Sequence, residues 1–248
     1  MIDKIFKKYQ SHYVNLFQKN FWNDGFVKLE IPKNNSKKKI FKKLNEVLLN
    51  TNNFKNMVKE KYKSKGIIDI REDEKFYDDF IDFLIDDRII DKINFISCKK
   101  LVPIAIKIRI NKYKNKKKNF FFNRHRDTFK KNNNIYGNIP PLINLHIYPT
   151  SSSEAPENQL KVWPGTHKKF FSNIIDKISI QFTKSLDIKT SNDNMLFFDT
   201  SLIHAIHPTP NLNGSIRCMY NFLDINQIHE EIEDFHLVSK WKNKIYGN

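Results

Sequence analysis

Apolar residues follow helical spacing through the first hundred residues of the chain. In residues 2–17 they recur every three or four positions, as along the buried stripe of an amphipathic helix. The segment NSKKKIFKKLNEVLL, residues 35–49, has the same spacing and offers Asn35 or Ser36 as its N-cap. A third stripe runs through DEKFYDDFIDFLIDDRIIDKI, residues 73–93. This part of the chain is therefore predicted to be rich in helices.

From about residue 101 the apolar residues alternate with polar ones, as in strands with one buried face. In VPIAIKIRIN the isoleucines from Ile104 to Ile110 lie on one face, and Lys107, Arg109 and Asn111 lie on the other. Turn signals from Pro, Gly and Asn separate further predicted strands in LINLHIY, QLKVW, KSLDIKT, NMLFFD and IRCMYNFL.

Helices followed by many short strands favour an α+β fold whose core is a barrel or jelly roll. We expect a single domain over residues 1–248, because one core can serve a chain of this length. Within it we expect a helix-rich support (1–100), a barrel core (101–225) and a C-terminal helical extension (226–248).

Two polar segments interrupt the strands and are predicted to be exposed loops. The first is the lysine-rich stretch NKYKNKKKN, residues 111–119, which we interpret as a solvated loop. The second is PTSSSEAPEN, residues 149–158, which is either a solvated loop or a mobile lid over a site.

The chain is strongly basic, with 43 Lys and Arg residues against 27 Asp and Glu and a net charge of +16. Such a charge suggests a nucleic-acid partner or an anionic surface. The same chain is rich in Asn and Ile and has only 6 Gly residues, as expected where A/T-rich codons dominate. We therefore interpret most of the charge as compositional background and expect no specific nucleic-acid partner.

The two cysteines, Cys98 and Cys218, form neither a CxxC motif nor a disulfide framework, which indicates a reducing compartment. No apolar run has the length that a bilayer requires, and the basic, Gln-containing N-terminal segment does not resemble a signal peptide. We expect a cytoplasmic protein that does not associate with membranes.

The segment FFFNRHRDTFK places His125 and Asp127 two residues apart. Two side chains on the same side of an extended segment can converge on one ion, and His204 offers a third ligand downstream. Two histidines and one carboxylate on one face of an octahedral Fe(II) leave three positions for a bidentate cosubstrate and dioxygen. Arg217, with its planar fork of donors, suits a carboxylate at the far end of that cosubstrate.

Each assignment has a structural alternative. His125 and Asp127 can simply pair at the surface, and His207 either competes with His204 for the metal or hydrogen-bonds in a turn. His167, in PGTHKK, is interpreted as a structural residue that orders its loop.

The polar face of LINLHIY carries Asn144 and His146, which point either to solvent or into the barrel. If this face lines the cavity, Asn144 is a candidate for binding the cosubstrate. The same reasoning makes Lys107 and Arg109 candidates for an anionic cosubstrate or substrate.

In their order along the chain, these motifs resemble the phytanoyl-CoA dioxygenase-type family of Fe(II)/2-oxoglutarate-dependent oxygenases over nearly the whole length. FWNDGFVKLEIP is similar to the family's opening Asp-Gly-Phe strand, and ENQLKVWPGTHKK is similar to its Asn-Gly-x-Leu stretch with the following Pro-Gly-Ser-His. Between and after them stand His125-x-Asp127, then Asp199, His204 and Arg217. A single His-x-Asp pair is weak evidence, whereas the ordered set is strong.

The chain also departs from the family pattern. Gln159 replaces the usual glycine, Thr166 replaces the usual serine, and the polar insert lengthens the preceding connection. The spacing from His204 to the arginine is long, which keeps His207 as a competing ligand. We prefer His204 because its five-residue spacing from Asp199 resembles the family's closing motif.

The resemblance implies a double-stranded β-helix, a cupin-like jelly-roll barrel with N-terminal helices packed on its outer sheet. It implies that His125, Asp127 and His204 hold Fe(II) and that Arg217 binds 2-oxoglutarate, with O2 consumed and succinate and CO2 released. Hydroxylation of a small-molecule metabolite is expected, with an anionic substrate suggested by the basic residues.

Other outcomes stay open at this point. Asp127 retains the carboxylate that halogenating relatives lack, which disfavours halogenation but not desaturation or ring closure. The substrate and the oligomeric state do not follow from the sequence. Two alternatives from other classes are a nucleic-acid-binding or base-modifying protein and a catalytically inactive barrel that serves as a binding module.

Overall fold

The structure is a computed structural model of the chain. It describes residues 16–58, 66–111, 125–127, 130–131, 134–135, 142–150, 160–168, 180–206, 215–230, 232 and 234–247. The predicted N-terminal helix is therefore described only from residue 16, where residues 16–24 are helical. Most of the lysine-rich stretch and most of the polar insert lie outside the described residues, as does His207.

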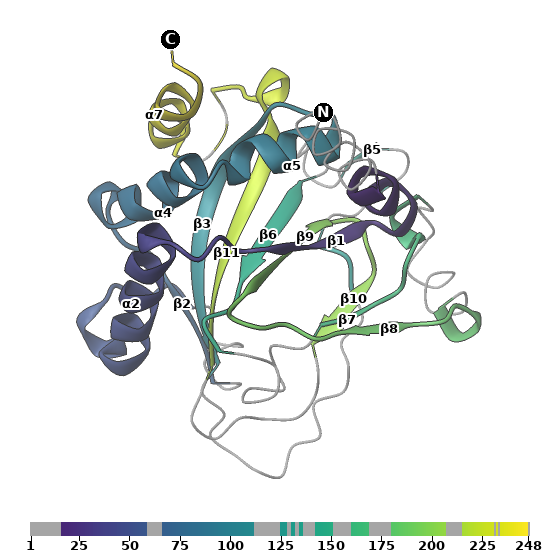
Figure 1. Ribbon diagram of the computed structural model, residues 1–248, viewed down its shortest axis with the longest axis horizontal. Coiled ribbons are helices and arrows are strands. Elements are labelled where there is room, and N and C mark those ends of the chain that lie inside the picture. The colour runs from purple at the N-terminus through teal and green to yellow at the C-terminus, as the bar shows by residue number, and fades with distance from the viewer. Residues whose placement is uncertain are drawn as a thin grey trace, which may run out of the picture.

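A large antiparallel sheet runs through the centre of the molecule (Figure 1), with its strands in the order β1-β9-β6-β11-β3-β2. The two long strands β3 and β11 pair along their length, with one register shift between Asn221 and Phe222. The strands of this sheet are β1 (Phe26–Glu30), β2 (Ile67–Ile70), β3 (Leu101–Asn111), β6 (Ile143–Ile147), β9 (Asn194–Asp199) and β11 (Ser215–Asp224).

A smaller antiparallel sheet, in the order β10-β7-β8, faces the large one. Its strands are β7 (Leu160–Val162), β8 (Leu186–Ile188) and β10 (His204–Ile206). A buried apolar cluster fills the space between the sheets and contains Leu160 and Val162 from the small sheet together with Leu196 and Phe198 from the large one. A separate short pair consists of β4 (Lys130–Lys131) and β5 (Asn134–Ile135).

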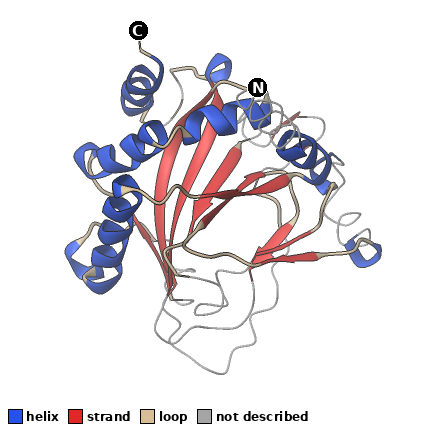
Figure 2. Ribbon diagram, viewed as in Figure 1, coloured by secondary structure: helices blue, strands red, loops and turns tan. Residues whose placement is uncertain are grey.

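Helices cover the outer face of the large sheet (Figure 2). They are α2 (Asn35–Leu49), α4 (Glu74–Asp86), α5 (Ile89–Ser97) and α7 (Phe235–Tyr246). The chain also forms the short 3-10 turns η1 (Thr51–Asn53), η4 (Thr166–Lys168) and η5 (Ile225–Gln227). None of the helices in the described ranges has the length and apolar character needed to cross a membrane.

Two helix starts depend on side-chain caps. The N-cap of α2 is Asn34, whose side chain accepts a hydrogen bond from the Lys37 amide at 3.0 Å. The helix thus begins one residue after Asn34, and the predicted N-cap at Asn35 or Ser36 is wrong by one or two positions. Asp73 caps α4 in the same way by accepting from the Phe76 amide at 3.0 Å.

Alternation along the strands sorts side chains between the two faces of the large sheet. Ile106, Ile108 and Ile110 of β3 pack into the main core beneath the helices, together with Tyr220 of β11. The Tyr220 hydroxyl donates to the Phe80 carbonyl of α4 at 3.1 Å and ties the sheet to the helix layer. The predicted α+β fold, a double-stranded β-helix with helices packed on its outer sheet, is confirmed.

Candidate metal centre

The His125–Asp127 segment is attached to the edge of the small sheet by backbone hydrogen bonds. The amide of His125 donates to the His204 carbonyl and the amide of His204 donates back to His125, both at 3.0 Å. The Asp127 amide donates to the Thr200 carbonyl at 2.9 Å. Because β10 carries His204 at its first position, this pairing sets the two histidines side by side.

The three predicted ligands meet at this edge. The His125 Nε2 atom lies 3.4 Å from Asp127 Oδ1, and the His204 Nε2 atom lies 3.7 Å from Asp127 Oδ2. One ligand atom from each residue lies within 4.8 Å of the others, as required for a shared metal ion. The side chain of His204 is only 5% exposed, whereas those of His125 and Asp127 are 39% exposed, so the cluster is buried on one side and open on the other.

A backbone contact fixes the protonation of the His204 ring. Its Nδ1 atom lies 2.9 Å from the Leu202 carbonyl oxygen. A carbonyl oxygen can only accept, so Nδ1 carries the proton and the lone pair of Nε2 points toward Asp127. A neutral imidazole oriented by its second nitrogen is the form in which histidine binds metals.

Electrostatics favour the ligand forms of these side chains. Burial opposes ionisation of Asp127, but the adjacent His204 and His125 outweigh it and hold the carboxyl pKa well below its usual range. Burial lowers the pKa of His204, and the Asp127 carboxylate opposes this only in part. An ionised carboxylate and a neutral imidazole are the forms in which Asp and His side chains bind a divalent transition metal.

Asn144 lies inside the barrel and contacts the carboxylate of the cluster. It is 2% exposed, and its Nδ2 atom donates to Asp127 Oδ2 at 3.1 Å. Asn221, its register partner on β11, donates in turn to Asn144 Oδ1. The predicted role of Asn144 toward a cosubstrate stays a prediction, and the structure adds a contact that orients Asp127.

Arg217 lies on the inner face of β11 and is 4% exposed. Burial and the positive charge of Arg217 hold the pKa of the neighbouring His146 well below its usual value. The His146 Nδ1 atom is 3.1 Å from the Tyr148 hydroxyl, and burial raises the pKa of Tyr148 to about 12. The positive charge of Arg217 also contributes to the lowered pKa of His204. Arg217 therefore lies close enough to the ligand cluster to affect it electrostatically.

The other predicted cofactor ligands lie on β3. Arg109 forms a bidentate ion pair with Asp69 of β2, with Nε–Oδ1 and Nη2–Oδ2 distances of 2.6 and 2.7 Å. Arg109 is the register partner of Arg217 and shares its face of the sheet, whereas Lys107 is exposed. Their roles toward a cofactor stay predictions.

Arg126, between the two clustered residues, was not identified from the sequence. Its side chain is buried and donates to the Thr166 carbonyl at 2.7 Å and to the Ser201 carbonyl. The Thr166 hydroxyl accepts from the Ile203 amide at 3.0 Å, so the same turn also holds the residue before His204. In the sequence, the position of Arg126 between two predicted ligands is the only feature that could have indicated that it anchors this segment.

His167 follows Thr166 in the 3-10 turn η4, and its surroundings are those of a structural residue. Its Nε2 atom is 3.2 Å from the Trp22 carbonyl. Gly25 has a φ of +86°, and a Cβ atom there would lie 2.5 Å from His167 Nδ1. Glycine is therefore required at position 25 both by its backbone conformation and by the histidine ring.

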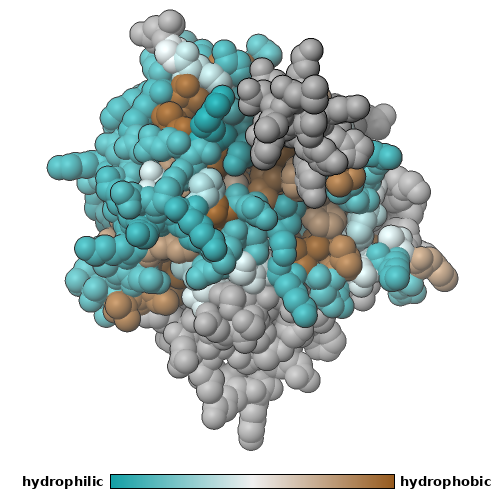
Figure 3. Space-filling model, in the orientation of Figure 1, coloured by the Kyte–Doolittle hydropathy of each residue, from teal (hydrophilic) through white to brown (hydrophobic). Residues whose placement is uncertain are grey.

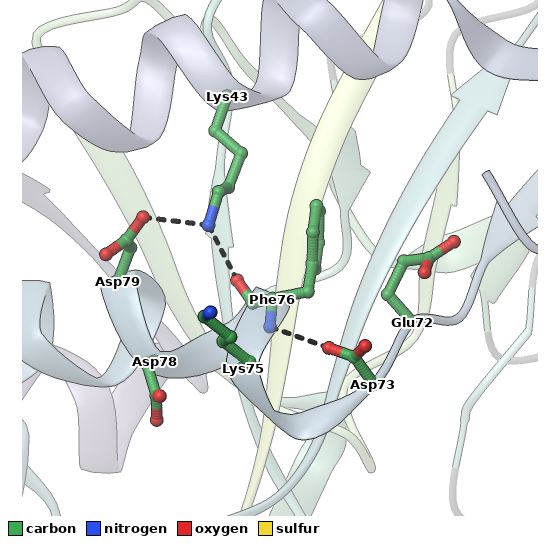
Figure 4. A pocket seen from close by; sticks show the side chains of 7 residues that line it. All are labelled: Lys43, Glu72, Asp73, Lys75, Phe76, Asp78 and Asp79. Carbon is green, nitrogen blue, oxygen red and sulfur yellow. Dashed lines mark hydrogen bonds and ion pairs between the residues drawn. The ribbon is translucent and has the colours of Figure 1, made fainter. Parts of the chain in front are cut away.

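An open hollow between α2 and α4 lies in the helix layer, apart from the ligand cluster (Figure 4). There the Lys43 ammonium donates to Asp79 at 2.7 Å and to the Phe76 carbonyl at 2.9 Å. The remaining lining residues are Glu72, Asp73, Asp78 and Lys75. It contains none of the predicted site residues.

No protein-family model and no curated protein sequence matches the chain, but solved structures do. SnoN, a non-heme alpha-ketoglutarate-dependent epimerase from nogalamycin biosynthesis, is 10% identical with a TM-score of 0.67, over 86% of this chain and 82% of that one. HygX from Streptomyces hygroscopicus, with nickel, 2-oxoglutarate and hygromycin B bound, is 11% identical with a TM-score of 0.58, over 83% and 85%. EctD from S. alaskensis, with 2-oxoglutarate and 5-hydroxyectoine, is 14% identical with a TM-score of 0.59, over 89% and 82%.

At these identities the likeness establishes the fold, and activity has to be argued from the site. The match extends over most of each chain, so the helices and both sheets belong to one shared architecture.

Proposed function

We propose that this chain is an Fe(II)/2-oxoglutarate-dependent oxygenase that hydroxylates a small-molecule metabolite. The observation that carries the proposal is the cluster of His125, Asp127 and His204, whose ligand atoms lie within 4.8 Å of one another. The tautomer of His204, fixed by its contact with the Leu202 carbonyl, supports metal binding rather than a surface pair. The shared fold with SnoN, HygX and EctD supports this class of enzyme.

In this proposal His125, Asp127 and His204 hold Fe(II). Asn144 keeps the Asp127 carboxylate in place through its hydrogen bond of 3.1 Å. When bound, iron and 2-oxoglutarate supply the oxidising chemistry, with O2 as oxidant and succinate and CO2 as products. The Arg217 guanidinium binds the distal carboxylate of 2-oxoglutarate.

Buried aromatic and apolar side chains pack against the inner side of the cluster. Phe198 packs edge-on against the rings of His204 and His146, with centroid distances of 5.4 and 4.8 Å. Tyr148 and Leu196 are fully buried in the same apolar cluster. Such a wall leaves the more exposed side, at His125 and Asp127, as the side from which a substrate approaches.

We infer a small molecule rather than a polymer as substrate. HygX and EctD were solved with hygromycin B and 5-hydroxyectoine bound, which supports this class of substrate for the shared fold. SnoN is an epimerase, so product analysis has to separate hydroxylation from epimerisation, desaturation and ring closure. We also place the protein in the reducing cytoplasm, because both Cys98 and Cys218 are free thiols.

The test is a screen of metabolites for stimulated release of succinate from 2-oxoglutarate in the presence of Fe(II). A true substrate should raise succinate release above the unstimulated rate and gain one oxygen atom, detected by mass spectrometry. Omission of Fe(II) should abolish both signals. A protein that binds neither iron nor 2-oxoglutarate would be a binding module, and the proposal would be wrong.

A further inference from the structure

Two neighbouring asparagines lie on the inner face of the large sheet. Asn221 of β11 and Asn144 of β6 are direct partners in the antiparallel register. The residues on either side of Asn221, Tyr220 and Phe222, pack into the main core beneath the helices, so alternation turns Asn221 toward the barrel interior. Its Nδ2 atom donates to Asn144 Oδ1, and Asn144 Nδ2 donates to Asp127 Oδ2 at 3.1 Å. A chain of two hydrogen bonds thus runs from β11 to the proposed metal centre.

Chemistry fixes the direction of this chain of hydrogen bonds. A carboxylate that binds a metal is ionised and only accepts, so Asn144 has to present its amide nitrogen to Asp127. The carbonyl oxygen of Asn144 is then left for its partner, and Asn221 has to present a nitrogen as well. If the Asn221 amide were turned over, two carbonyl oxygens would face each other. The donor of Asn221 therefore holds Asn144 in the orientation that serves the carboxylate.

Among the described residues, the side chain of Asn221 has a hydrogen-bond partner at one end only. Its Oδ1 atom is buried and accepts from no group in the described part of the chain. Asn94, another half-buried asparagine, is bonded at both ends: its Nδ2 atom donates to the Tyr246 hydroxyl at 2.9 Å, and its Oδ1 atom accepts from the Leu101 amide at 2.8 Å. Buried polar groups are nearly always paired, and an unpaired one requires an explanation. For Asn221 the bond toward Asn144 supplies it.

We propose that Asn221 is a positioning residue of the metal centre, which acts through Asn144 to hold the Asp127 carboxylate turned toward the metal. Contacts of this kind orient the ligands of a metal, and their loss typically lowers metal affinity about ten- to a hundredfold. The relay consists of neutral amides, so it transmits an orientation without adding charge to the site. This inference rests on the proposed function and extends the support of the metal centre to β11.

Asn221→Asp tests the direction of the relay with almost no change of shape. The new carboxylate, when ionised, only accepts, so Asn144 has to turn its nitrogen toward position 221 and its oxygen toward Asp127. We expect Co(II) affinity, measured by titration calorimetry without 2-oxoglutarate, to fall about ten- to a hundredfold. The visible absorption of bound Co(II) should change as well, because the Asp127 carboxylate is held differently. Simple attraction between the added negative charge and the cation would instead raise the affinity, so the sign of the change is decisive.

A double-variant cycle tests whether the effect passes through Asn144. Asn144→Ala should itself weaken Co(II) binding, and Asn221→Asp added to it should weaken the binding no further. Asn94→Asp is the matched control, because it makes the same exchange in a half-buried asparagine of the helix layer. It should lower the thermal unfolding temperature through the lost bond to Tyr246 and leave Co(II) affinity and absorption unchanged.

The outcomes separate this inference from the proposed function. If wild type binds Co(II) and Asn221→Asp binds it equally or more tightly, Asn221 does not position the carboxylate and the inference is wrong. The inference is also wrong if Asn221→Asp loses the same affinity in the Asn144→Ala background, because the effect then does not pass through Asn144. Should Asn221→Asp not fold, Asn221→Ala, which removes the donor, is judged by the same two criteria. If wild type itself does not bind Co(II), the proposed function fails.

Discussion

At the scale of single residues, the choice of the third ligand depends on the ring of His204. Its Nδ1 atom is committed to the Leu202 carbonyl, which leaves Nε2 for a metal. We predict that His204→Ala lowers iron affinity by more than about a hundredfold and abolishes turnover, because a ligand is lost and not only an outer-shell contact. His207→Ala should at most reduce turnover. Iron titration of both variants decides, and the opposite ranking would move the ligand to His207.

Arg217 supports a second prediction at this scale. Arg217→Ala should raise the 2-oxoglutarate requirement about ten- to a hundredfold, because a charge-assisted bidentate contact contributes on the order of 1.5–3 kcal/mol. Arg217→Lys should recover only part of this loss, since an ammonium cannot reproduce the planar fork. The measurement is a titration of 2-oxoglutarate at saturating Fe(II). An unchanged requirement in both variants would assign the distal carboxylate to Lys107 or Arg109.

At the scale of elements, the His125–Asp127 segment has a side-chain anchor in addition to its backbone hydrogen bonds. The Arg126 guanidinium links it to the carbonyls of Thr166 and Ser201 on two neighbouring turns. We predict that Arg126→Ala destabilises the fold by about 2–4 kcal/mol and weakens metal binding. Arg126→Lys should recover part of the stability but less of the metal affinity, because one ammonium does not span both turns in the same geometry.

Thermal unfolding and metal titration of these two variants test the anchor together. Arg88→Ala is a suitable control, because Arg88 is an exposed arginine whose partner is Asp91, three residues away. It should change stability by less than about 1 kcal/mol and leave metal affinity intact. Equal metal affinity in wild type and Arg126→Ala would show that the segment does not need the anchor.

The elements also show how far the sequence leads. Alternation predicts β3 and β6 well, because one face of each strand packs under the helices and the other faces the barrel. For β9 and β11 the signals are the flanking turns, since apolar side chains of β9 are buried on both of its faces. The stripe through residues 73–93 does not form one helix, since Arg88 adopts a left-handed φ of 53° and separates α4 from α5. The polar run Asp86-Asp87-Arg88 is the local signal for that break.

The candidate site is predictable only in part. The proposed metal ligands follow from motif order, because His125, Asp127 and His204 belong to short local patterns. The contacts that support them do not, because Asn144 meets Asn221 through the register of β6 and β11. Cross-strand register depends on tertiary packing, which no spacing along a single chain reveals.

At the scale of the whole molecule, the net charge of +16 raises the question of nucleic acid. Figure 3 shows a largely hydrophilic face on which apolar residues form separate spots rather than one platform for stacked bases. We predict weak, non-specific binding of duplex DNA or RNA that collapses between low and physiological salt. Binding measured across a salt series tests this. Succinate release stimulated by oligonucleotides alone would instead favour a base-modifying enzyme.

The most direct test of the metal centre is the iron-dependent conversion of 2-oxoglutarate to succinate by wild type and Asp127→Ala, with iron affinity measured alongside. The control is Asp193→Ala, which removes an exposed carboxylate paired only with Lys37 among the described residues. Wild type and Asp193→Ala should bind iron and release succinate equally. Asp127→Ala should bind iron more weakly and release no succinate, because it lacks the only carboxylate of the cluster. Full succinate release by Asp127→Ala would contradict the assignment of this cluster as the metal centre.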